Sequence, residues 1–484
     1  MRANQNYNQT FGLNAITADQ IEELHFATLE VLDRVGVRFH DAESLEIMKR
    51  GGARVDGALV KIPAYMVKRA LSTVPERIAI ANRNGERAMF LEKGRMYFGT
   101  GSDTPNTIDL YSGERRPAVK QDTANFARLC DALEHIDFVM SMGLASDVPV
   151  KNSYIHQFEA MVLNTAKPIM YTASNVGDCR AVVEMCEAIA GGEEQLRANP
   201  FIMLYDEPSS PLQHSGDALQ KMLYLAEKHL PCLYCPTVLM GGTGPVTAAG
   251  TIVVGNSEFL SALVLQQLKS PGAPMIYAGS GAGLDMKTMI CVYGSVEEAV
   301  NCVAMVKMGD YYKLPTFVTA GCSNSVKFDG QAAAEAMFSI FANVVGGAQL
   351  IHDLGYIEAG LTSSMEMLLL CNESAGVCKR FVKGIEVNAK AIALEVIEAV
   401  GPGGNFITEG HTLENYRDSI YFNDLFDHNI YEHWVENGSM TFETRANKRA
   451  REILESHKPP ELSADVVERV RGIVSERDRK ASRD

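Results

Sequence analysis

Eight short apolar runs, rich in residues that favour β-strands, recur along this 484-residue chain. Their starts are roughly 30 to 42 residues apart, which leaves room for a strand, a helix and two loops in each unit. Strands that alternate with helices predict βαβ units in a parallel sheet. The runs lie at residues 96–98, 138–140, 168–171, 201–205, 232–235, 274–277, 315–318 and 349–352.

The segments between the runs have apolar residues at three- and four-residue spacing, which predicts amphipathic helices. Continuous apolar strands between such helices fit a sheet that is buried on both faces. Eight units are enough for a (β/α)8 TIM barrel, in which chemistry takes place where the strands end. An open doubly wound sheet of eight strands remains the alternative, because periodicity does not show closure. The helical segments are residues 123–133, 155–163, 218–226, 297–308 and 332–345.

The chain is longer than a barrel of about 250 residues, so we expect additional segments on both sides of it. Residues 1–90 predict an N-terminal helical segment with helices at about 18–35 and 64–71. The barrel is expected at 91–362, and a helical C-terminal extension at 363–484. The sequence Gly401-Pro-Gly-Gly404 interrupts this extension, since glycine and proline end helices.

Charge and hydrophobicity narrow the possible partners and location. The formal net charge of −15 argues against a nucleic acid or an anionic membrane as a partner, because both attract clustered Lys and Arg. Hydrophobic residues make up 46% of the chain, which is enough for a large core. No apolar stretch reaches the roughly 18 uninterrupted residues of a membrane-spanning helix. The polar start lacks the apolar region of a signal peptide, so a cytoplasmic location is expected.

Two motifs could suggest a metal or a nucleotide, and both are incomplete. Cys232 and Cys235 form the only CxxC among ten cysteines, and residues three apart on a strand face opposite sides. Since zinc needs three or four protein ligands, we expect reduced structural thiols and no bound metal. The loop Met240–Gly250 could hold an anion on backbone N–H groups, but it lacks the Gly-Lys-Ser/Thr ending of a P-loop.

Polar residues that follow the strands are the first candidates for a site. Asp206 and Glu207 follow the fourth run, where a carboxylate could act as acid or base. Asp329 and Gln331 follow the seventh run, and Asp329 could equally cap the next helix. His352 ends the eighth run, at a position from which a side chain can reach the barrel mouth.

Aromatic residues at or just beyond several strands are the second group of candidates. Rings that converge on one mouth can surround a cationic ligand, with each ring contributing about 0.5 to 2 kcal/mol once water is excluded. For any single ring, packing in the core is the competing interpretation. The candidates are Tyr97, Phe98, Tyr205, Tyr277 and Tyr356.

A set of motifs spread in order over nearly the whole chain resembles the trimethylamine methyltransferase family. This resemblance implies a TIM barrel that passes a methyl group from a methylated amine to the cobalt of a separate corrinoid protein. The motifs are Glu30–Val37, Gly52–Gly57, Ile62-Pro63, Pro208–Leu212, Gly241–Gly250, Gly294–Glu298, Asp329–Glu335, Gly401–Gly404 and His411-Thr412.

The sequence contains no pyrrolysine, the residue that supplies an electrophile for the amine in the archaeal trimethylamine enzymes. It therefore resembles the branch whose relatives use quaternary amines such as glycine betaine, proline betaine or carnitine, and glycine betaine is the preferred substrate. A quaternary ammonium is already activated, because attack by Co(I) on a methyl carbon expels a neutral tertiary amine. Neither protonation nor a Lewis-acidic metal is then needed.

The resemblance implies positioning of the substrate, without acid or base catalysis by the protein. Substrate contacts are expected from rings around the trimethylammonium, from His352 and backbone N–H groups near Gly321 or Gly355 on the carboxylate, and from Asp206 and Glu358. Positioning is assigned to His352, Glu207 and Gln331. The corrinoid protein is expected to dock at the barrel mouth, and the chain itself to form a homo-oligomer. Two alternatives remain: a hydrolase or lyase that uses Glu207 and His352, and a betaine-binding protein without catalysis.

Overall fold

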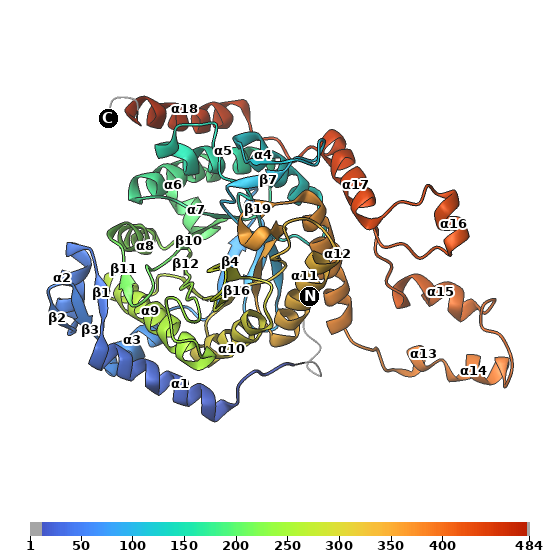
Figure 1. Cartoon of the computed structure of the whole chain (residues 1–484), viewed down its shortest axis with the longest axis horizontal. Coiled ribbons are helices and arrows are strands. Elements are labelled where there is room, and N and C mark those ends of the chain that lie inside the picture. The colour runs from blue at the N-terminus through green and yellow to red at the C-terminus, as the bar shows by residue number, and fades with distance from the viewer. Residues whose placement is uncertain (1–11, 482–484) are drawn as a thin grey trace.

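The computed structural model describes residues 12–481, and a parallel β-sheet forms its centre (Figure 1). Seven strands lie side by side, and the second apolar run joins the two edges of this sheet. Parallel bridges from Gly99 to Phe138 and from Val139 to Ile169 make this connection. In sheet order the strands are β6 (Tyr97–Thr100), β17 (Leu350–Leu354), β16 (Thr316–Thr319), β13 (Met275–Ala278), β12 (Cys232–Tyr234), β10 (Ile202–Asp206) and β9 (Ile169–Tyr171).

One helix follows each of these eight wall segments and packs outside the sheet (Figure 1). The fold is therefore TIM-barrel-like, and the eight predicted runs lie in its wall in chain order. A short helix, α7 (Glu193–Ala198), precedes β10. The wall helices are α4 (Lys120–Ala132), α5 (Ser153–Asn164), α6 (Val176–Ala190), α8 (Gly216–Lys228), α9 (Ala248–Lys269), α10 (Val296–Tyr312), α11 (Gly330–Gly346) and α12 (Met365–Val382).

Helix α9 is long and apolar enough, by length and composition, to cross a membrane, and no other helix of the described residues is. However, 72% of its most apolar window is buried inside the fold. It packs against α1, α2, α3 and α8. Its hydrophobicity is therefore accounted for by its place in the core.

The N-terminal segment contains strands as well as the predicted helices, so the expectation of a helical segment is incomplete. Three strands form a small sheet with the short β11 (Gln213–His214), in the order β11-β1-β3-β2. Each has only three residues, too few to show an alternating pattern in the sequence. The elements are α1 (Ala18–Glu30) with a π-helical end at Val31–Val35, β1 (Val37–Phe39), α2 (Ala42–Gly51), β2 (Arg54–Asp56), β3 (Leu59–Lys61) and α3 (Ala64–Thr73).

A hairpin of β4 (Ile78–Ala81) and β5 (Arg87–Leu91) closes the end of the barrel where the strands begin. Its residues Ile80 and Met89 share a core cluster with inward-facing wall residues such as Met203 and Ile276. The backbone N–H of Phe90 in this hairpin donates to the hydroxyl of Tyr97, at 2.8 Å. The hairpin thus fills the barrel interior at this end.

The C-terminal extension has two parts. Helices α17 (Phe442–Ser456) and α18 (Ala464–Ala481) pack on the barrel, α17 against α12 and α4, and α18 against α5 and α6. The chain between α12 and α17, residues 383–440, projects away from the body, and we call it the arm (Figure 1). It contains α13 (Ala389–Ile392), α14 (Leu394–Val400), α15 (Gly410–Ser419) and α16 (Tyr431–Glu436).

Candidate active site

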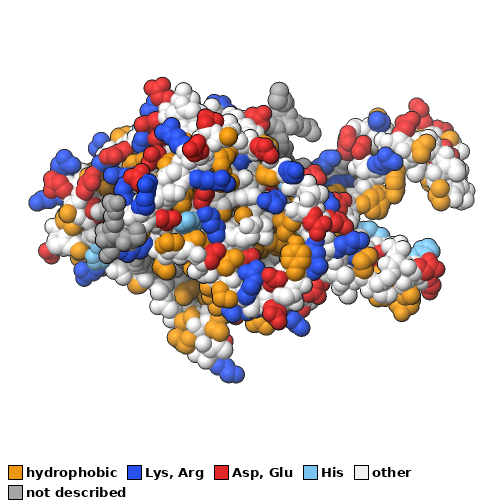
Figure 2. Space-filling model, turned by 90° about the horizontal axis from the view of Figure 1, so that it is seen from above, with side chains coloured by type: hydrophobic (Ala, Val, Ile, Leu, Met, Phe, Trp, Pro, Cys, Tyr) orange, Lys and Arg blue, Asp and Glu red, His pale blue; other side chains and the backbone are white. Residues whose placement is uncertain are grey.

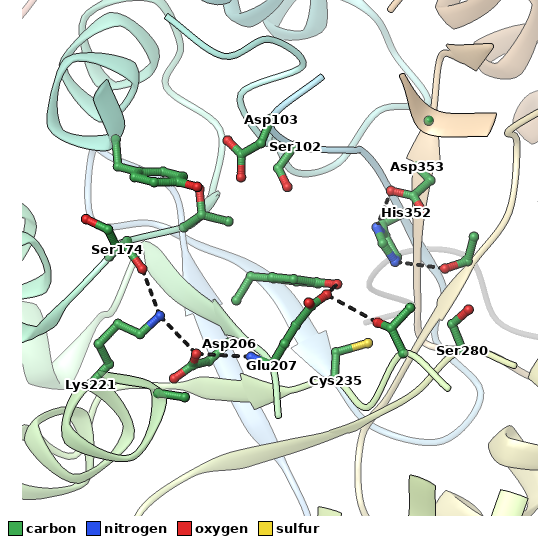
Figure 3. A pocket seen from close by; sticks show the side chains of 18 of the residues that line it. Ser102, Asp103, Ser174, Asp206, Glu207, Lys221, Cys235, Ser280, His352 and Asp353 are labelled. Atoms are coloured by element: carbon green, nitrogen blue, oxygen red, sulfur yellow. Dashed lines mark hydrogen bonds and ion pairs between the residues drawn. The ribbon is translucent and has the colours of Figure 1, made fainter. Parts of the chain in front are cut away.

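A polar cavity of about 470 Å3 lies where the barrel strands end (Figure 3). Asp206 and Glu207 from the end of β10, Thr319 from β16, and His352 and Asp353 from β17 line its floor and walls. Residues of the loops that follow the strands complete the lining. This is the end of the fold at which TIM-barrel enzymes carry out chemistry.

Asp206 and Lys221 form a buried ion pair at one side of the cavity. Lys221 comes from α8, and its Nζ lies 2.9 Å from Oδ1 of Asp206. The same Nζ donates to the carbonyl oxygen of Ala173, at 2.7 Å. Burial raises the pKa of Asp206 to about 6, although Lys221 opposes this shift. The second oxygen, Oδ2, has no hydrogen-bond partner within residues 12–481.

The carboxylate of Glu207 is held in place by two hydroxyl groups. It accepts hydrogen bonds from Tyr205 and from Oγ1 of Thr237, the latter at 3.2 Å. Burial raises the pKa of Glu207, while these hydrogen bonds lower it. Lys221 already pairs with Asp206, so the Glu207 carboxylate has no cationic partner of its own.

His352 has a fixed ring orientation beside Asp353. Its ring stacks on Phe317 with 3.9 Å between the ring centroids, and Nε2 lies 3.2 Å from Oγ1 of Thr319. Nδ1 lies 2.8 Å from Oδ1 of Asp353, although no partner in the described chain has hydrogen-bond geometry with this nitrogen.

A third carboxylate, Asp103, comes from the loop after β6. It accepts a hydrogen bond from Oγ of Ser141 at 3.0 Å, and burial raises its pKa. Asp103 has φ of 59° and Asp353 has φ of 71°. Non-glycine residues rarely adopt this backbone conformation, and where they do so they cluster at functional sites. The strained backbone thus places two carboxylates at the cavity.

Four tyrosines, Tyr154, Tyr205, Tyr293 and Tyr356, line the cavity. Burial raises the pKa of Tyr154 to about 12 and the pKa values of the other three well above their usual range. These phenols therefore stay neutral at physiological pH. Neutral rings among carboxylates favour a cationic ligand, because the face of each ring attracts positive charge.

The cavity brings together five of the residues predicted from the sequence, namely Tyr205, Asp206, Glu207, His352 and Tyr356. The structure places three predicted rings elsewhere. Tyr97 points toward the closing hairpin. Phe98 points outward, with Nζ of Lys379 5.1 Å from its ring centroid. Tyr277 also points outward, where its hydroxyl donates to Asn256 at 3.1 Å. Their expected role around the ammonium group is not supported by these positions.

Other predicted contacts also lie outside the cavity. The amide of Gln331 donates to Glu335 on the exposed face of α11, at 2.9 Å. Glu358 forms an ion pair with Arg115 at 2.7 Å. The N–H of Gly321 donates to Oγ of Ser339 at 3.0 Å, and that of Gly355 donates to the Gly321 carbonyl at 3.3 Å. Both N–H groups are thus occupied, so they do not fit the expected carboxylate contact.

The incomplete motifs have structural roles. Asp329 caps α11 by accepting from the N–H of Ala332, at 3.0 Å. In the glycine-rich loop, the Leu239 carbonyl accepts from the N–H groups of Gly242 and Gly244, both at 3.0 Å, so these groups do not point at a ligand. Burial raises the pKa values of Cys232 and Cys235 well above their usual range. Residues 12–481 contain no cluster of His, Cys, Asp and Glu able to hold a metal ion.

Sequence reasoning missed Asp103, Tyr154 and Tyr293. Asp103 directly follows Gly101-Ser102 at the end of the first apolar run, and this position was the available signal. Tyr154 lies in the first turn of α5, and Tyr293 in the loop between β15 (Cys291–Val292), which pairs with β14 (Gly283–Leu284), and α10. Neither follows a strand of the barrel wall, so nothing local marks them.

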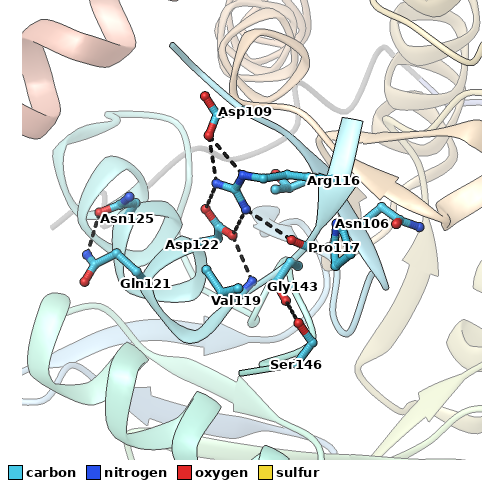
Figure 4. A network of polar contacts seen from close by, with 12 residues as sticks. Asn106, Asp109, Arg116, Pro117, Val119, Gln121, Asp122, Asn125, Gly143 and Ser146 are labelled. Atoms are coloured by element: carbon cyan, nitrogen blue, oxygen red, sulfur yellow. Dashed lines mark hydrogen bonds and ion pairs between the residues drawn. The ribbon is translucent and has the colours of Figure 1, made fainter. Parts of the chain in front are cut away.

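A small sheet beside the cavity is anchored by Arg116 (Figure 4). The guanidinium lies 2.9 Å from Asp109 and 2.7 Å from Asp122, which in turn accepts from the N–H of Val119 at 2.9 Å. The backbone N–H of Ser112 and the Arg116 guanidinium, which both donate to Asp109, lower its pKa to about 2. The network ties the turn that carries Asp109 to the start of α4. The sheet contains β7 (Asn106–Ile108), β8 (Arg115–Pro117), β18 (Tyr356–Ile357) and β19 (Thr362–Ser363).

The family model described as trimethylamine methyltransferase matches residues 2–482. The chain belongs to this family. It is 34% identical over 468 residues to the trimethylamine methyltransferase MttB of Desulfitobacterium hafniense, covering 96% of this chain and 94% of that protein. It is 28% identical over 466 residues to the glycine betaine methyltransferase of another strain of that species, covering 96% of this chain and 97% of the relative. The predicted family is confirmed.

A solved structure agrees with the fold. The monomethylamine methyltransferase MtmB of Methanosarcina barkeri superposes with a TM-score of 0.54, covering 91% of this chain and 88% of that one. Only 11% of the aligned residues are identical, so this likeness bears on the fold alone.

Proposed function

We propose that this protein transfers a methyl group from a small quaternary amine to the Co(I) centre of a corrinoid protein. Membership in a methyltransferase family supports the reaction class. The observation that carries the substrate class is the cavity itself, in which carboxylates outnumber cationic groups and four tyrosines face the ligand space. Such a lining stabilises a desolvated ammonium cation.

The side chains would act by binding and orientation. Glu207, fixed by Tyr205 and Thr237, would hold the cation by charge, and the tyrosine rings would replace its water. His352, fixed by Phe317, would limit the space and so orient one N–CH3 bond toward the open end. The leaving tertiary amine is neutral, so no side chain needs to donate a proton. Positioning and electrostatics are then the protein's whole contribution.

The corrinoid protein would dock where the cavity opens, and the corrinoid supplies the nucleophile for the methyl group. Asp217 and Gly360 line the cavity, and Asp217 is exposed, which places it at the edge available to a partner. We also propose a cytoplasmic location, because all ten cysteines are free and Co(I) survives only under reducing conditions. Glycine betaine remains a candidate substrate on the resemblance alone.

We expect purified protein, mixed with a reduced corrinoid protein, to convert Co(I) to methyl-Co(III) with a quaternary amine and not with trimethylamine. The cobalt absorbance spectrum reports this conversion. Rapid conversion with trimethylamine would contradict the quaternary-amine assignment. Conversion of an amine substrate without corrinoid protein would favour the hydrolase or lyase alternative, and binding without any conversion would favour a binding protein.

The arm supports the expectation that the chain forms a homo-oligomer. Within the described helices α13, α14, α15 and α16, no side chain is buried. Hydrophobic side chains are visible on the projecting part of the molecule (Figure 2). Permanent homo-oligomer interfaces are more apolar than transient ones, and the corrinoid protein must dissociate after each transfer. The exposed apolar residues are Ile385, Val387, Ile392, Leu394, Ile397, Phe406, Ile407, Leu413, Tyr416, Ile420, Tyr421, Phe422, Phe426, Ile430, Tyr431 and Val435.

We expect the double substitution Ile407→Asp and Leu413→Asp to shift the protein to a smaller species in light scattering after gel filtration. These side chains are 78% and 85% exposed, so the substitutions leave the barrel core intact. Val150→Asp is the control, since Val150 is 90% exposed but lies outside the arm. A wild-type protein that is monomeric at micromolar concentration, or an unchanged size in the arm variant, would contradict this proposal.

A further inference from the structure

The cavity is lined by more acidic than basic side chains. Five carboxyl side chains line it, from Asp103, Asp206, Glu207, Asp217 and Asp353. Among the described residues that line it, the basic side chains are Lys221 and His352. Each of these lies beside a carboxylate, Lys221 at 2.9 Å from Asp206 and His352 at 2.8 Å from Asp353. Two of these carboxylates, Asp103 and Glu207, remain without a basic partner in the lining.

This arrangement is unsuited to a ligand that carries its own carboxylate. Lys221 already bonds Asp206 and the Ala173 carbonyl, and it is 7% exposed. Nδ1 of His352 faces Asp353, which would also face a ligand carboxylate bound there. A buried carboxylate is stable only when a cation or several hydrogen-bond donors accompany it. Here a betaine carboxylate would instead meet like charges, which repel it.

The same arrangement suits a ligand that donates hydrogen bonds. Ser102 and Thr172 surround the Asp103 carboxyl group, and Figure 3 shows Asp103, Glu207 and Asp353 around a common space. A carboxylate accepts hydrogen bonds at both oxygens, and a hydroxyl group on the ligand can supply one.

We infer that the cavity selects a methylated ammonium whose fourth substituent is uncharged and carries a hydroxyl group, in preference to a betaine. This inference rests on the proposed methyl transfer from a quaternary amine and names the member of that class. Asp103 and Glu207 hold the positive charge, and one of the cavity carboxylates accepts the hydroxyl hydrogen. The charge on the fourth substituent is then the property that decides specificity.

Choline and glycine betaine form a matched pair of probes, because they share the trimethylammonium group and differ at the other end. Isothermal titration calorimetry with the full-length protein should give a dissociation constant at least about ten-fold lower for choline. Tetramethylammonium has the positive charge but no hydrogen-bond donor, so its dissociation constant should lie between those of choline and glycine betaine. Asp103→Asn should lower the ratio of the two affinities toward one, because it removes one repelling charge. Asp217→Asn is the control, since Asp217 is exposed to solvent.

Equal or tighter binding of glycine betaine, or no binding of choline, would overturn the inference. Equal binding of tetramethylammonium and choline would overturn the role of the hydroxyl group. The outcomes for the two proposals are separable. Methylation of cobalt by glycine betaine together with tighter betaine binding would uphold the methyl transfer and reject the charge selection. Tight choline binding without any methylation of cobalt would uphold the selection and reject the methyl transfer.

Discussion

Glu207→Gln is expected to raise the dissociation constant of a trimethylammonium substrate by about ten- to a hundred-fold at pH 8. The substitution keeps the shape of the side chain and removes its charge. A charge about 5 Å from a cation at an effective dielectric constant of about 20 contributes about 3 kcal/mol, which sets the upper limit. Calorimetric titration of the purified variant measures the effect, and the rate of cobalt methylation at low substrate should fall in parallel.

The effect of Glu207→Gln should shrink at lower pH. Burial raises the pKa of Glu207, so the wild-type side chain becomes neutral before an ordinary glutamate does, and it then resembles the variant. The groups near this carboxylate include Tyr205, Asp206, Thr237, Asp353 and His352. Asp217→Asn also removes a cavity charge, but from the first turn of α8 at the edge of the cavity, and should change affinity less than about three-fold because water screens it there. Equal effects of the two variants would mean that Glu207 is not at the cation.

Lys221→Met is expected to lower the free energy of unfolding by about 3 to 5 kcal/mol at pH 8, because it leaves the buried Asp206 carboxylate without its cation. Burial raises the pKa of Asp206 to about 6 even with Lys221 present, and loss of Lys221 raises it further. A raised carboxyl pKa means that stability is highest when the group is protonated and falls as pH rises through the folded-state value. The loss should therefore be smaller at pH 5 than at pH 8, as urea unfolding at both values would show.

Lys228→Met provides the matched control for this prediction. Lys228 lies on the same helix and pairs with Glu187 at 3.0 Å and Glu193 at 2.8 Å, but closer to solvent. Such pairs contribute about 0 to 1 kcal/mol, so its removal should have a small effect. A loss for Lys221→Met no greater than for Lys228→Met, or a loss independent of pH, would show that Asp206 does not depend on Lys221.

The barrel wall could be predicted because parallel strands buried on both faces leave an uninterrupted apolar signature. The face of the sheet toward which each strand residue points could not be predicted. Tyr205 and Tyr277 both lie in such runs, yet Tyr205 faces the barrel interior, whereas Tyr277 faces α9. A shift of one residue moves a side chain to the other face of the sheet. Continuous apolar runs show no alternation between apolar and polar residues, so they do not indicate which side chains face the barrel interior. Only part of the aromatic lining was therefore predicted.

The loops and the arm lie beyond local patterns for a different reason. Asp103 reaches the cavity through a left-handed backbone conformation, which its sequence neighbours do not indicate. Tyr154 and Tyr293 arrive from segments whose positions depend on the assembled barrel. The arm helices were expected from their composition. Whether the apolar faces of these helices are covered depends on tertiary contacts, which cannot be inferred from the local sequence pattern.

Methyl transfer from a quaternary amine to cobalt is tested most directly by a single-turnover reaction with deuterated methyl groups. The protein is mixed with a reduced corrinoid protein and either trideuteromethyl-labelled choline or labelled glycine betaine, and both products are measured by mass spectrometry. We expect one deuterated methyl group on the corrinoid for each tertiary amine released, with a slower reaction for Glu207→Gln. Release of tertiary amine without label on the corrinoid, or no labelled corrinoid with either quaternary amine, would contradict this expectation.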